Sequence, residues 1–157
     1  MLYVAVIGGS ACTEEESKLA HEIGADVSRR GGIIICGGGS GVMEAAAAGA
    51  CEAGGTAIGI LPGENTGQGN HYLSFAVATG LGEARNAIIA RTADVVIAVG
   101  GEYGTLSEIA LALKMDKPVI GLNSWVLKPP RDLSRAIVAA VTAAEAVEKA
   151  YSLAGKG

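Results

Sequence analysis

Short apolar runs alternate along the chain with longer stretches in which apolar residues recur at helical spacing. The apolar runs are typical of buried strands, which we expect at residues 2–7, 33–36, 56–61, 73–78, 95–99 and 118–122. The periodic stretches predict helices at residues 13–30, 42–53, 83–93 and 105–115. A terminal helix is expected where one apolar face is formed by Leu133, Ile137, Val141, Ala144 and Val147.

The expected strands are almost entirely apolar, and they alternate with helices. Such strands favour a parallel sheet that is covered by helices on both faces. The sequence therefore predicts an α/β fold with a Rossmann-like, doubly wound, mainly parallel sheet, whose ligand crevice lies at the carboxyl ends of the strands. The length of 157 residues fits one domain, so we interpret residues 1–157 as a single Rossmann-like nucleotide-binding domain.

Glycine-rich turns follow the strands expected at 2–7, 33–36 and 95–99. Glycine lets the backbone approach a ligand closely, and a helix start presents free N–H groups, so these turns are candidate phosphate sites. A polar, glycine-rich segment at 64–72 is interpreted as a mobile loop beside the site. The expected ligand-binding residues of the turns are Gly8, Gly9, Ser10, Gly37, Gly38, Gly39, Ser40, Gly41, Met43, Gly100, Gly101, Tyr103, Gly104 and Thr105.

Composition narrows the choice of partners and compartment. The formal net charge of −4 provides no basic surface and argues against nucleic acid as a primary partner. No apolar run approaches the roughly 18 residues of a membrane span, and no basic leader precedes the first strand, so no membrane partner is expected. The three cysteines, Cys12, Cys36 and Cys51, lack C-x-x-C spacing and are expected to be reduced thiols of a cytoplasmic protein.

The familiar cofactor and metal motifs are missing from the sequence. Residues 37–42, GGGSGV, lack the final glycine of the G-x-G-x-x-G dinucleotide motif, and no Walker A pattern occurs beside a predicted strand. His21 and His71 have no metal-ligand spacing around them, and no convincing Ser-His-Asp arrangement can be assembled. We therefore expect no metal site and no resident cofactor.

Arg85 and Glu108 are the candidate catalytic residues. Glu108 lies one helical turn past Gly104 and Thr105, where a carboxylate can stabilise an oxocarbenium-like sugar while water attacks an N-glycosidic bond. Arg85 would pair either with a 5′-phosphate or with Glu108. Structural alternatives stay open, because the segment from Thr105 to Glu108 also fits a capping box and Arg85 also fits a surface cation. Tyr103 fits packing as well as stacking on a base.

The segment from Gly101 to Glu108, with Arg85 upstream, resembles the PGGxGTxxE signature and preceding arginine of the LOG-like proteins, long labelled possible lysine decarboxylases. Residues 37–45, GGGSGVMEA, resemble the GGxxGVMEA loop of a bacterial subgroup of that family, in which the arginine is followed by asparagine, as Arg85 is by Asn86. Molybdenum cofactor carrier proteins are related to this family. The resemblance implies a nucleoside 5′-monophosphate phosphoribohydrolase-like activity, adds Asn86 to the ligand-binding residues, and implies a homodimer or higher homo-oligomer that pairs through helices flanking the site.

The sequence also departs from the family signature. Aligned without a gap, Gly100 replaces the family proline and Glu102 replaces the second glycine. Asn86 stands where the phosphoribohydrolases have lysine, and Glu44 stands where they have glycine. A cationic ligand is thus lost and carboxylates are added near the crevice.

Hypotheses from different functional classes follow. The first is an enzyme that cleaves the N-glycosidic bond of a phosphorylated ribose compound, which Arg85 and Glu108 favour. The alternative is a non-catalytic binding or carrier protein for a nucleotide or molybdopterin-type cofactor, which Asn86 and Glu102 favour. A structural role without a ligand is the third. A pyridoxal phosphate decarboxylase is rejected, because no lysine stands beside a glycine turn.

Overall fold

Alternate side chains of a central strand point to opposite faces of a sheet, so a strand that is apolar throughout needs a layer of helices on each face. The computed structural model describes residues 1–155, and its seven-stranded sheet has the order β4-β3-β2-β1-β5-β6-β7, with all neighbouring strands parallel. The strands are β1 (Tyr3–Gly8), β2 (Ile33–Cys36), β3 (Thr56–Leu61), β4 (Phe75–Ala78), β5 (Val95–Val99), β6 (Val119–Leu122) and β7 (Val138–Ala139). The helices are α1 (Glu14–Arg29), α2 (Val42–Glu52), α3 (Asn86–Thr92), α4 (Tyr103–Lys114) and α5 (Ala143–Ala154), with 3-10 turns η1 (Thr66–Gln68) and η2 (Gly82–Arg85).

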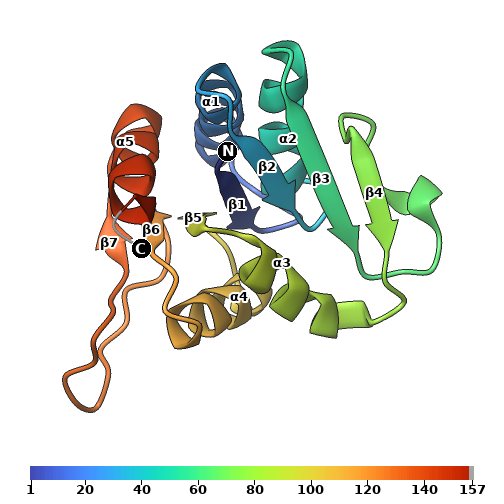
Figure 1. The fold of residues 1–157 in the computed structure, drawn as a ribbon. Helices are drawn as coiled ribbons and strands as arrows, with labels where there is room; N and C mark the ends of the chain where they lie inside the picture. The colour runs from blue at the N-terminus through green and yellow to red at the C-terminus, as the bar shows by residue number, and fades with distance from the viewer. Residues whose placement is uncertain (156–157) are drawn as a thin grey trace.

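The helices form one layer on each face of the sheet (Figure 1). Helices α1, α2 and α5 cover one face, where they share a core with Val4, Val6 and Ile34. Helices α3 and α4 cover the other face, where Ala5 and Ile7 belong to a second core. Successive residues of β1 are therefore buried in different cores, which explains why this strand is apolar throughout. The expected α/β, Rossmann-like fold is confirmed.

Helices α1 and α2 pack against each other through glycine. A Cβ on Gly24 of α1 would overlap the carbonyl oxygen of Ala46, and a Cβ on Gly49 of α2 would overlap the carbonyl oxygen of His21. Glycine on each helix thus lets the backbone of one lie directly on the other. This close approach sets the distance between the helices that follow the first two glycine turns.

Most predicted boundaries agree with the structure. Strands β2, β3 and β5 have the expected limits, and Thr13 caps α1, accepting a hydrogen bond from the Glu16 N–H at 3.1 Å. Strand β4 starts two residues later than expected, at Phe75, and the helix expected at 83–93 begins as the 3-10 turn η2. Within residues 1–155, no helix combines the length and the apolar character that crossing a membrane requires.

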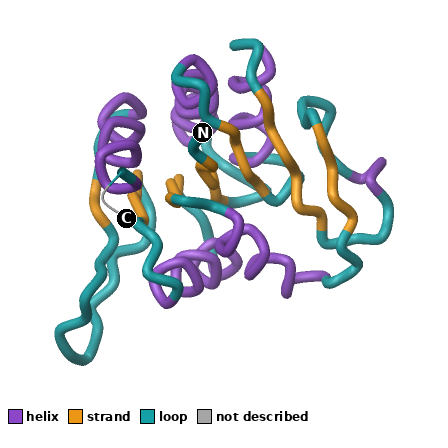
Figure 2. Tube along the Cα trace, in the orientation of Figure 1, coloured by secondary structure: helices purple, strands orange, loops and turns teal. Residues whose placement is uncertain are grey.

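The expected terminal helix from Leu133 is wrong in its first part. Leu133 and Ile137 lie in the long loop between β6 and β7 (Figure 2), and α5 starts only at Ala143. Val138 instead pairs with Ile120 as part of β7. The apolar spacing that imitates one helix face therefore runs across a loop, an edge strand and a helix, and sequence spacing alone cannot separate them.

The polar segment 64–72 is tied to the second glycine turn. Asn70 donates from its N–H to the Gly38 carbonyl and from Nδ2 to the Gly39 carbonyl, both at 2.9 Å. The segment interpreted as a mobile loop thus contains the turn η1 and has hydrogen-bonded contacts to the glycine turn behind the crevice.

Candidate functional site

The carboxyl ends of β1 and β5 open onto a cleft of about 650 Å³. These strands are neighbours, and the chain leaves them in opposite directions across the sheet, so the cleft lies at the switch point where α/β sheets bind ligands. The residues lining it come from the β1–α1 turn, the start of α2, η2 with the start of α3, and the first turns of α4. They are Gly8, Gly9, Ser10, Ala11, Met43, Glu83, Arg85, Asn86, Glu102, Tyr103, Gly104, Thr105, Ser107 and Glu108.

Ten of the predicted site residues line this cleft together, and others do not. Lining it are Gly8, Gly9, Ser10, Met43, Arg85, Asn86, Tyr103, Gly104, Thr105 and Glu108. Away from the lining are Gly37, Gly38, Gly39, Ser40, Gly41, Gly100 and Gly101. The sequence interpretation missed Ala11, Glu83 and Ser107 as lining residues, since Ala11 and Glu83 lie outside the signature and Ser107 occupies one of its variable positions.

The second glycine turn supports the first from behind. The Ser40 hydroxyl donates to the Ser10 carbonyl at 2.9 Å, and the Val42 N–H donates to the Gly9 carbonyl at 3.1 Å. Gly41 adopts a φ of +67°, and a Cβ there would overlap the Gly9 carbonyl oxygen. The second glycine turn therefore holds the β1–α1 turn in place through hydrogen bonds, and glycine at position 41 is needed because the two backbones lie in contact there.

The first turn of α4 presents unpaired backbone donors to the cleft. The helix starts at Tyr103, and its N-cap residue Glu102 makes no side-chain capping hydrogen bond. The alternative interpretation of residues 105–108 as a capping box is wrong, because Thr105 lies inside the first turn rather than at the cap. Free N–H groups and the positive end of the helix dipole together favour an anion at this position.

Two departures from the family signature have a backbone explanation. Gly100 has a φ of +57°, a conformation that proline cannot adopt, and a Cβ there would lie 2.6 Å from the Glu16 carboxyl carbon. Glu102 has a φ of −116°, which any residue adopts, so no glycine is needed at this position. The turn before α4 thus follows a path in which the family proline would not fit.

Arg85 lies between the cleft and the second glycine turn. Its Nε donates to the Ile60 carbonyl at 2.9 Å, and its Nη1 donates to the side-chain oxygen of Asn86. A Cβ on Gly37 would lie 2.8 Å from Arg85 Nη2, so glycine at position 37 makes room for the guanidinium. Among the ion pairs within residues 1–155, none joins Arg85 to Glu108.

Asn86 connects this arginine to the first turn of α4. Its side chain is buried, with 5% exposure. The Nδ2 group donates to Ser107 Oγ at 3.1 Å, and the Ser107 hydroxyl donates to the Gly104 carbonyl at 2.6 Å. A chain of hydrogen bonds therefore runs from Arg85 through Asn86 and Ser107 to Gly104.

Glu108 is a half-buried carboxyl group that lines the cleft. Burial raises its pKa to about 7, against the opposing effect of the positive charge of Arg85. A carboxyl with such a pKa can hold or release a proton near neutral pH. Burial also raises the pKa of the neighbouring Cys36 thiol to about 11, so this cysteine stays protonated and is a poor nucleophile.

An aromatic pair stands at the start of α4. The ring of Tyr103 lies 5.7 Å from the ring of Trp125, centroid to centroid, with 33° between the planes. Trp125 Nε1 donates to the Glu102 carbonyl at 3.0 Å, and the neighbouring Ser124 hydroxyl donates to the Gly100 carbonyl at 2.7 Å. The loop after β6 thus holds the glycine turn before α4, a contact that sequence spacing could not indicate.

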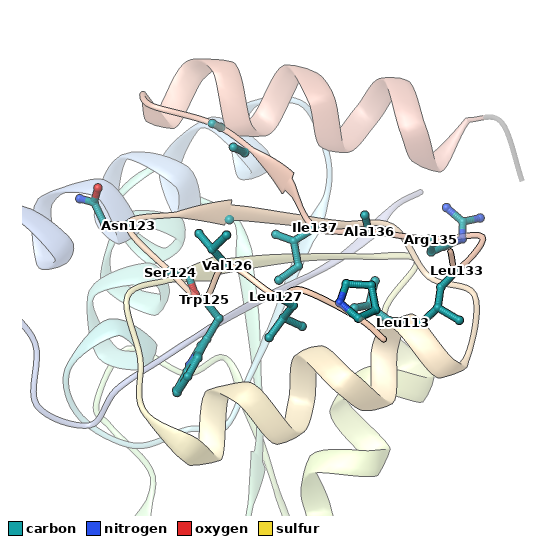
Figure 3. Close-up of a pocket in the computed structure, with 14 residues that line it drawn as sticks. Leu113, Asn123, Ser124, Trp125, Val126, Leu127, Leu133, Arg135, Ala136 and Ile137 are labelled. Carbon is teal, nitrogen blue, oxygen red and sulfur yellow. The ribbon is translucent and has the colours of Figure 1, made fainter. Parts of the chain in front are cut away.

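A second hollow, of about 350 Å³, lies between α4 and the β6–β7 loop. Figure 3 shows Trp125 at the N-terminal end of α4 and Leu127 and Ile137 over the middle of this hollow. Most of its lining side chains are apolar, and none of the predicted site residues belongs to it. Across residues 1–155, no group of three or more His, Cys, Asp or Glu residues is arranged to hold a metal ion.

Comparisons with known proteins identify relatives of similar length. The model of the SLOG cluster4 family matches residues 1–153. An uncharacterized protein of Archaeoglobus fulgidus is 42% identical over 130 residues, which cover 83% of this chain and 82% of that protein. The solved structure of the molybdenum cofactor binding protein from Rippkaea orientalis is 37% identical, with a TM-score of 0.87 and 96% of each chain covered. The molybdenum cofactor carrier protein from Chlamydomonas reinhardtii is 31% identical, with a TM-score of 0.83 and 98% of each chain covered.

Proposed function

The chain belongs to the SLOG cluster4 family, and on this premise we propose that it binds and carries a phosphorylated, ring-containing cofactor of the molybdenum cofactor type. The observation that carries the proposal is the cleft between β1 and β5, which is lined by both the uncapped start of α4 and Arg85. The similarity to proteins that bind or carry the molybdenum cofactor supports this choice of ligand over a generic nucleotide.

The residues of the cleft fit the phosphate end of such a ligand. The N–H groups of Tyr103, Gly104 and Thr105 are the first donors of α4, and the helix dipole adds to their attraction for an anion. Arg85 contributes a permanent positive charge on the same cleft. Because no metal-holding cluster occurs within residues 1–155, the protein in this proposal grips the organic part of the cofactor.

Binding without turnover suits the environment of Arg85 and Asn86. Arg85 is engaged with Ile60 and Asn86, and Asn86 occupies the position of the lysine that the phosphoribohydrolases have. The cleft thus offers one cation for the phosphate and keeps it in a fixed place. A fixed cation and a row of backbone donors hold an anion without contributing a reactive group.

The carrier proposal is tested by loading and release. The purified protein is mixed with molybdenum cofactor released from a molybdoenzyme, passed through gel filtration, and assayed for bound molybdenum by mass spectrometry. We expect co-elution, release of the cofactor in intact form to a cofactor-free molybdoenzyme, and affinity lowered about tenfold by Arg85→Ala. Arg91→Ala changes an exposed arginine on α3, the helix that follows Arg85 directly, and is the matched control. Absence of co-elution would overturn the proposal.

N-glycosidic hydrolysis is the second candidate function, and it rests on one observation. Glu108 is a half-buried carboxyl at the cleft with a pKa of about 7, suited to assist attack of water on a sugar. A panel of nucleoside 5′-monophosphates is incubated with the protein and chromatographed for free base and ribose 5-phosphate. Release that disappears in Glu108→Ala would replace the carrier function by hydrolysis.

The organisation of the whole chain is proposed on the same premise. We propose that residues 1–157 act as one nucleotide-type ligand-binding domain, of which residues 156–157 lie outside the described part, and that the chain forms a homodimer or higher homo-oligomer. A cytoplasmic location is proposed as well. It agrees with three free cysteines, Cys12, Cys36 and Cys51, none of which needs an oxidising compartment.

A further inference from the structure

Tyr103 is an aromatic residue that is largely exposed although a second aromatic ring packs against it. The residue is one of those that line the cleft, and it is 80% exposed. Exposed aromatic surface of this kind costs free energy in water unless a partner covers it. The chain has one tryptophan, and that residue, Trp125, is the one that packs against Tyr103.

Trp125 fixes the position of the tyrosine ring. The centroid distance of 5.7 Å and the tilt of 33° place the indole against one side of the phenol. The indole itself is anchored, because its Nε1 donates to the carbonyl of Glu102, the residue directly before Tyr103. The ring is therefore supported from one side while most of its surface stays open, which is the arrangement of a platform rather than of a core residue.

The platform adjoins the anion-binding end of the cleft. Tyr103 is the first residue of α4, and the free N–H groups of Gly104 and Thr105 follow it directly. Because these donors directly follow Tyr103 in the chain, one small molecule that carries both a phosphate and a planar ring can contact the donors and the phenol together. Nucleoside monophosphates and pterin phosphates share this chemistry.

We infer that Tyr103, backed by Trp125, is the stacking surface for the planar heteroaromatic ring of the phosphorylated ligand. This inference rests on the proposed function and extends it from the phosphate to the ring. Trp125 acts through Tyr103 and is a positioning residue. The stacking surface should make the protein bind phosphorylated ligands that carry a ring more tightly than ligands that carry a phosphate alone.

The test compares phosphorylated probes with and without a ring. Affinities for extracted molybdenum cofactor, AMP and ribose 5-phosphate are measured by calorimetry for the wild-type chain, Tyr103→Leu and Tyr103→Phe. We expect Tyr103→Leu to weaken binding of the preferred ring-bearing probe about tenfold or more and to leave ribose 5-phosphate unchanged. Tyr103→Phe keeps the ring and should bind like the wild type. The preferred probe distinguishes a pterin from a purine ligand.

Two further variants separate stacking from a general structural effect. Trp125→Leu should reduce the ratio of ring-bearing to ringless affinity without abolishing ribose 5-phosphate binding. Tyr72→Leu, which changes an exposed tyrosine outside the residues that line the cleft, is the matched control. An equal loss for all probes in Tyr103→Leu, or no loss, would overturn the platform. A wild-type chain that binds none of the probes would overturn the proposed function, and the platform would fall with it.

Discussion

Folding raises the pKa of the Glu108 carboxyl at the cleft. Its pKa rises from an ordinary value of 4.5 to about 7, chiefly because of burial. The folded protein therefore holds this proton more tightly than the unfolded chain does. Between pH 4.5 and about pH 7, the free energy of unfolding falls as the pH rises. Above about pH 7 the carboxylate is charged in both states, and the cost of placing this charge in the folded protein is fully present.

Glu108→Gln should remove this pH dependence. We expect the variant to be more stable than the wild type by about 1 to 3 kcal/mol at pH 8, and the two to converge near pH 4, because glutamine needs no proton. Urea unfolding at several pH values measures the difference. Glu22→Gln, on the exposed side of α1, controls for loss of one negative charge. Curves that stay parallel for wild type and Glu108→Gln would contradict the burial of this carboxyl.

Asn86 is a buried polar residue with a partner on each side. Asn86→Ala should cost about 1 to 3 kcal/mol of unfolding free energy, because the variant leaves Arg85 and Ser107 without their shared partner. Chemical denaturation measures this cost. Asn65→Ala, which removes an exposed hydrogen bond to the Gly67 N–H, is the matched control and should cost less. Equal costs would mean that the series of hydrogen bonds from Arg85 to Gly104 adds nothing to the stability of the protein.

At the scale of elements, the contact between α1 and α2 depends on two glycines facing the neighbouring backbone. Helix propensity alone would favour alanine over glycine by about 1 kcal/mol in a helix interior. The close backbone approach at Gly24 and Gly49 reverses this preference, since a methyl group at either position would overlap a carbonyl oxygen of the neighbouring helix. Small residues are therefore required by the packing of the pair and not by either helix alone.

Gly49→Ala should destabilise the protein by about 1 to 3 kcal/mol, because the new Cβ overlaps the His21 carbonyl and forces the helices apart. Thermal and urea unfolding measure the change. Gly104→Ala is the matched control: a Cβ there meets nothing within 4 Å, so we expect no loss or a small gain in stability. A gain for Gly49→Ala would show that α1 and α2 separate without cost.

The start of α4 shows how elements cooperate at the site. Ser124 and Trp125, which follow β6, donate hydrogen bonds to the glycine turn before this helix. Asn86 hydrogen-bonds both Arg85 and Ser107, and so connects the arginine to the first turns of α4. Each part comes from a different connection between strands of the sheet. The geometry of the cleft is therefore a property of several connections together.

At the scale of the whole molecule, the sheet leaves apolar side chains uncovered at one edge. Phe75 and Val77 of the edge strand β4 are 64% and 46% exposed, and their register partners Ile58 and Ile60 belong to the core beneath α3 and α4. Leu81, directly before η2, and Ile88 of α3 are also exposed, and both elements contribute residues to the cleft. A second copy of the chain is the partner that we expect on this surface, in line with the proposed homo-oligomer.

Phe75→Lys should shift the assembly toward the monomer, because it places a charge on an apolar contact surface. Light scattering after size-exclusion chromatography measures the molar mass of wild type and variant at matched concentrations. Val141→Lys changes an exposed valine at the far side of the molecule, before α5, and should leave the mass unchanged. A monomeric wild type would refute the expectation.

Much of the fold follows from local sequence. Strand spacing, the glycine turns and the Thr13 cap depend on residues that are neighbours in the chain, so the expected Rossmann-like sheet and the positions of β2, β3 and β5 are confirmed. The same local rules placed Arg85, Asn86 and the start of α4 at one edge of the sheet, since carboxyl ends of parallel strands meet there.

Only the tertiary structure decided how these parts meet. The burial of Glu108, the anchoring of the glycine turn by Trp125 and the use of residues 37–41 as a brace rather than as cleft lining depend on segments far apart in the chain. The start of α4 at Tyr103 and the edge strand β7 were likewise set by packing and pairing against the sheet. Sequence pattern records the local preference of each segment, whereas burial and long-range hydrogen bonds arise only when the segments are brought together.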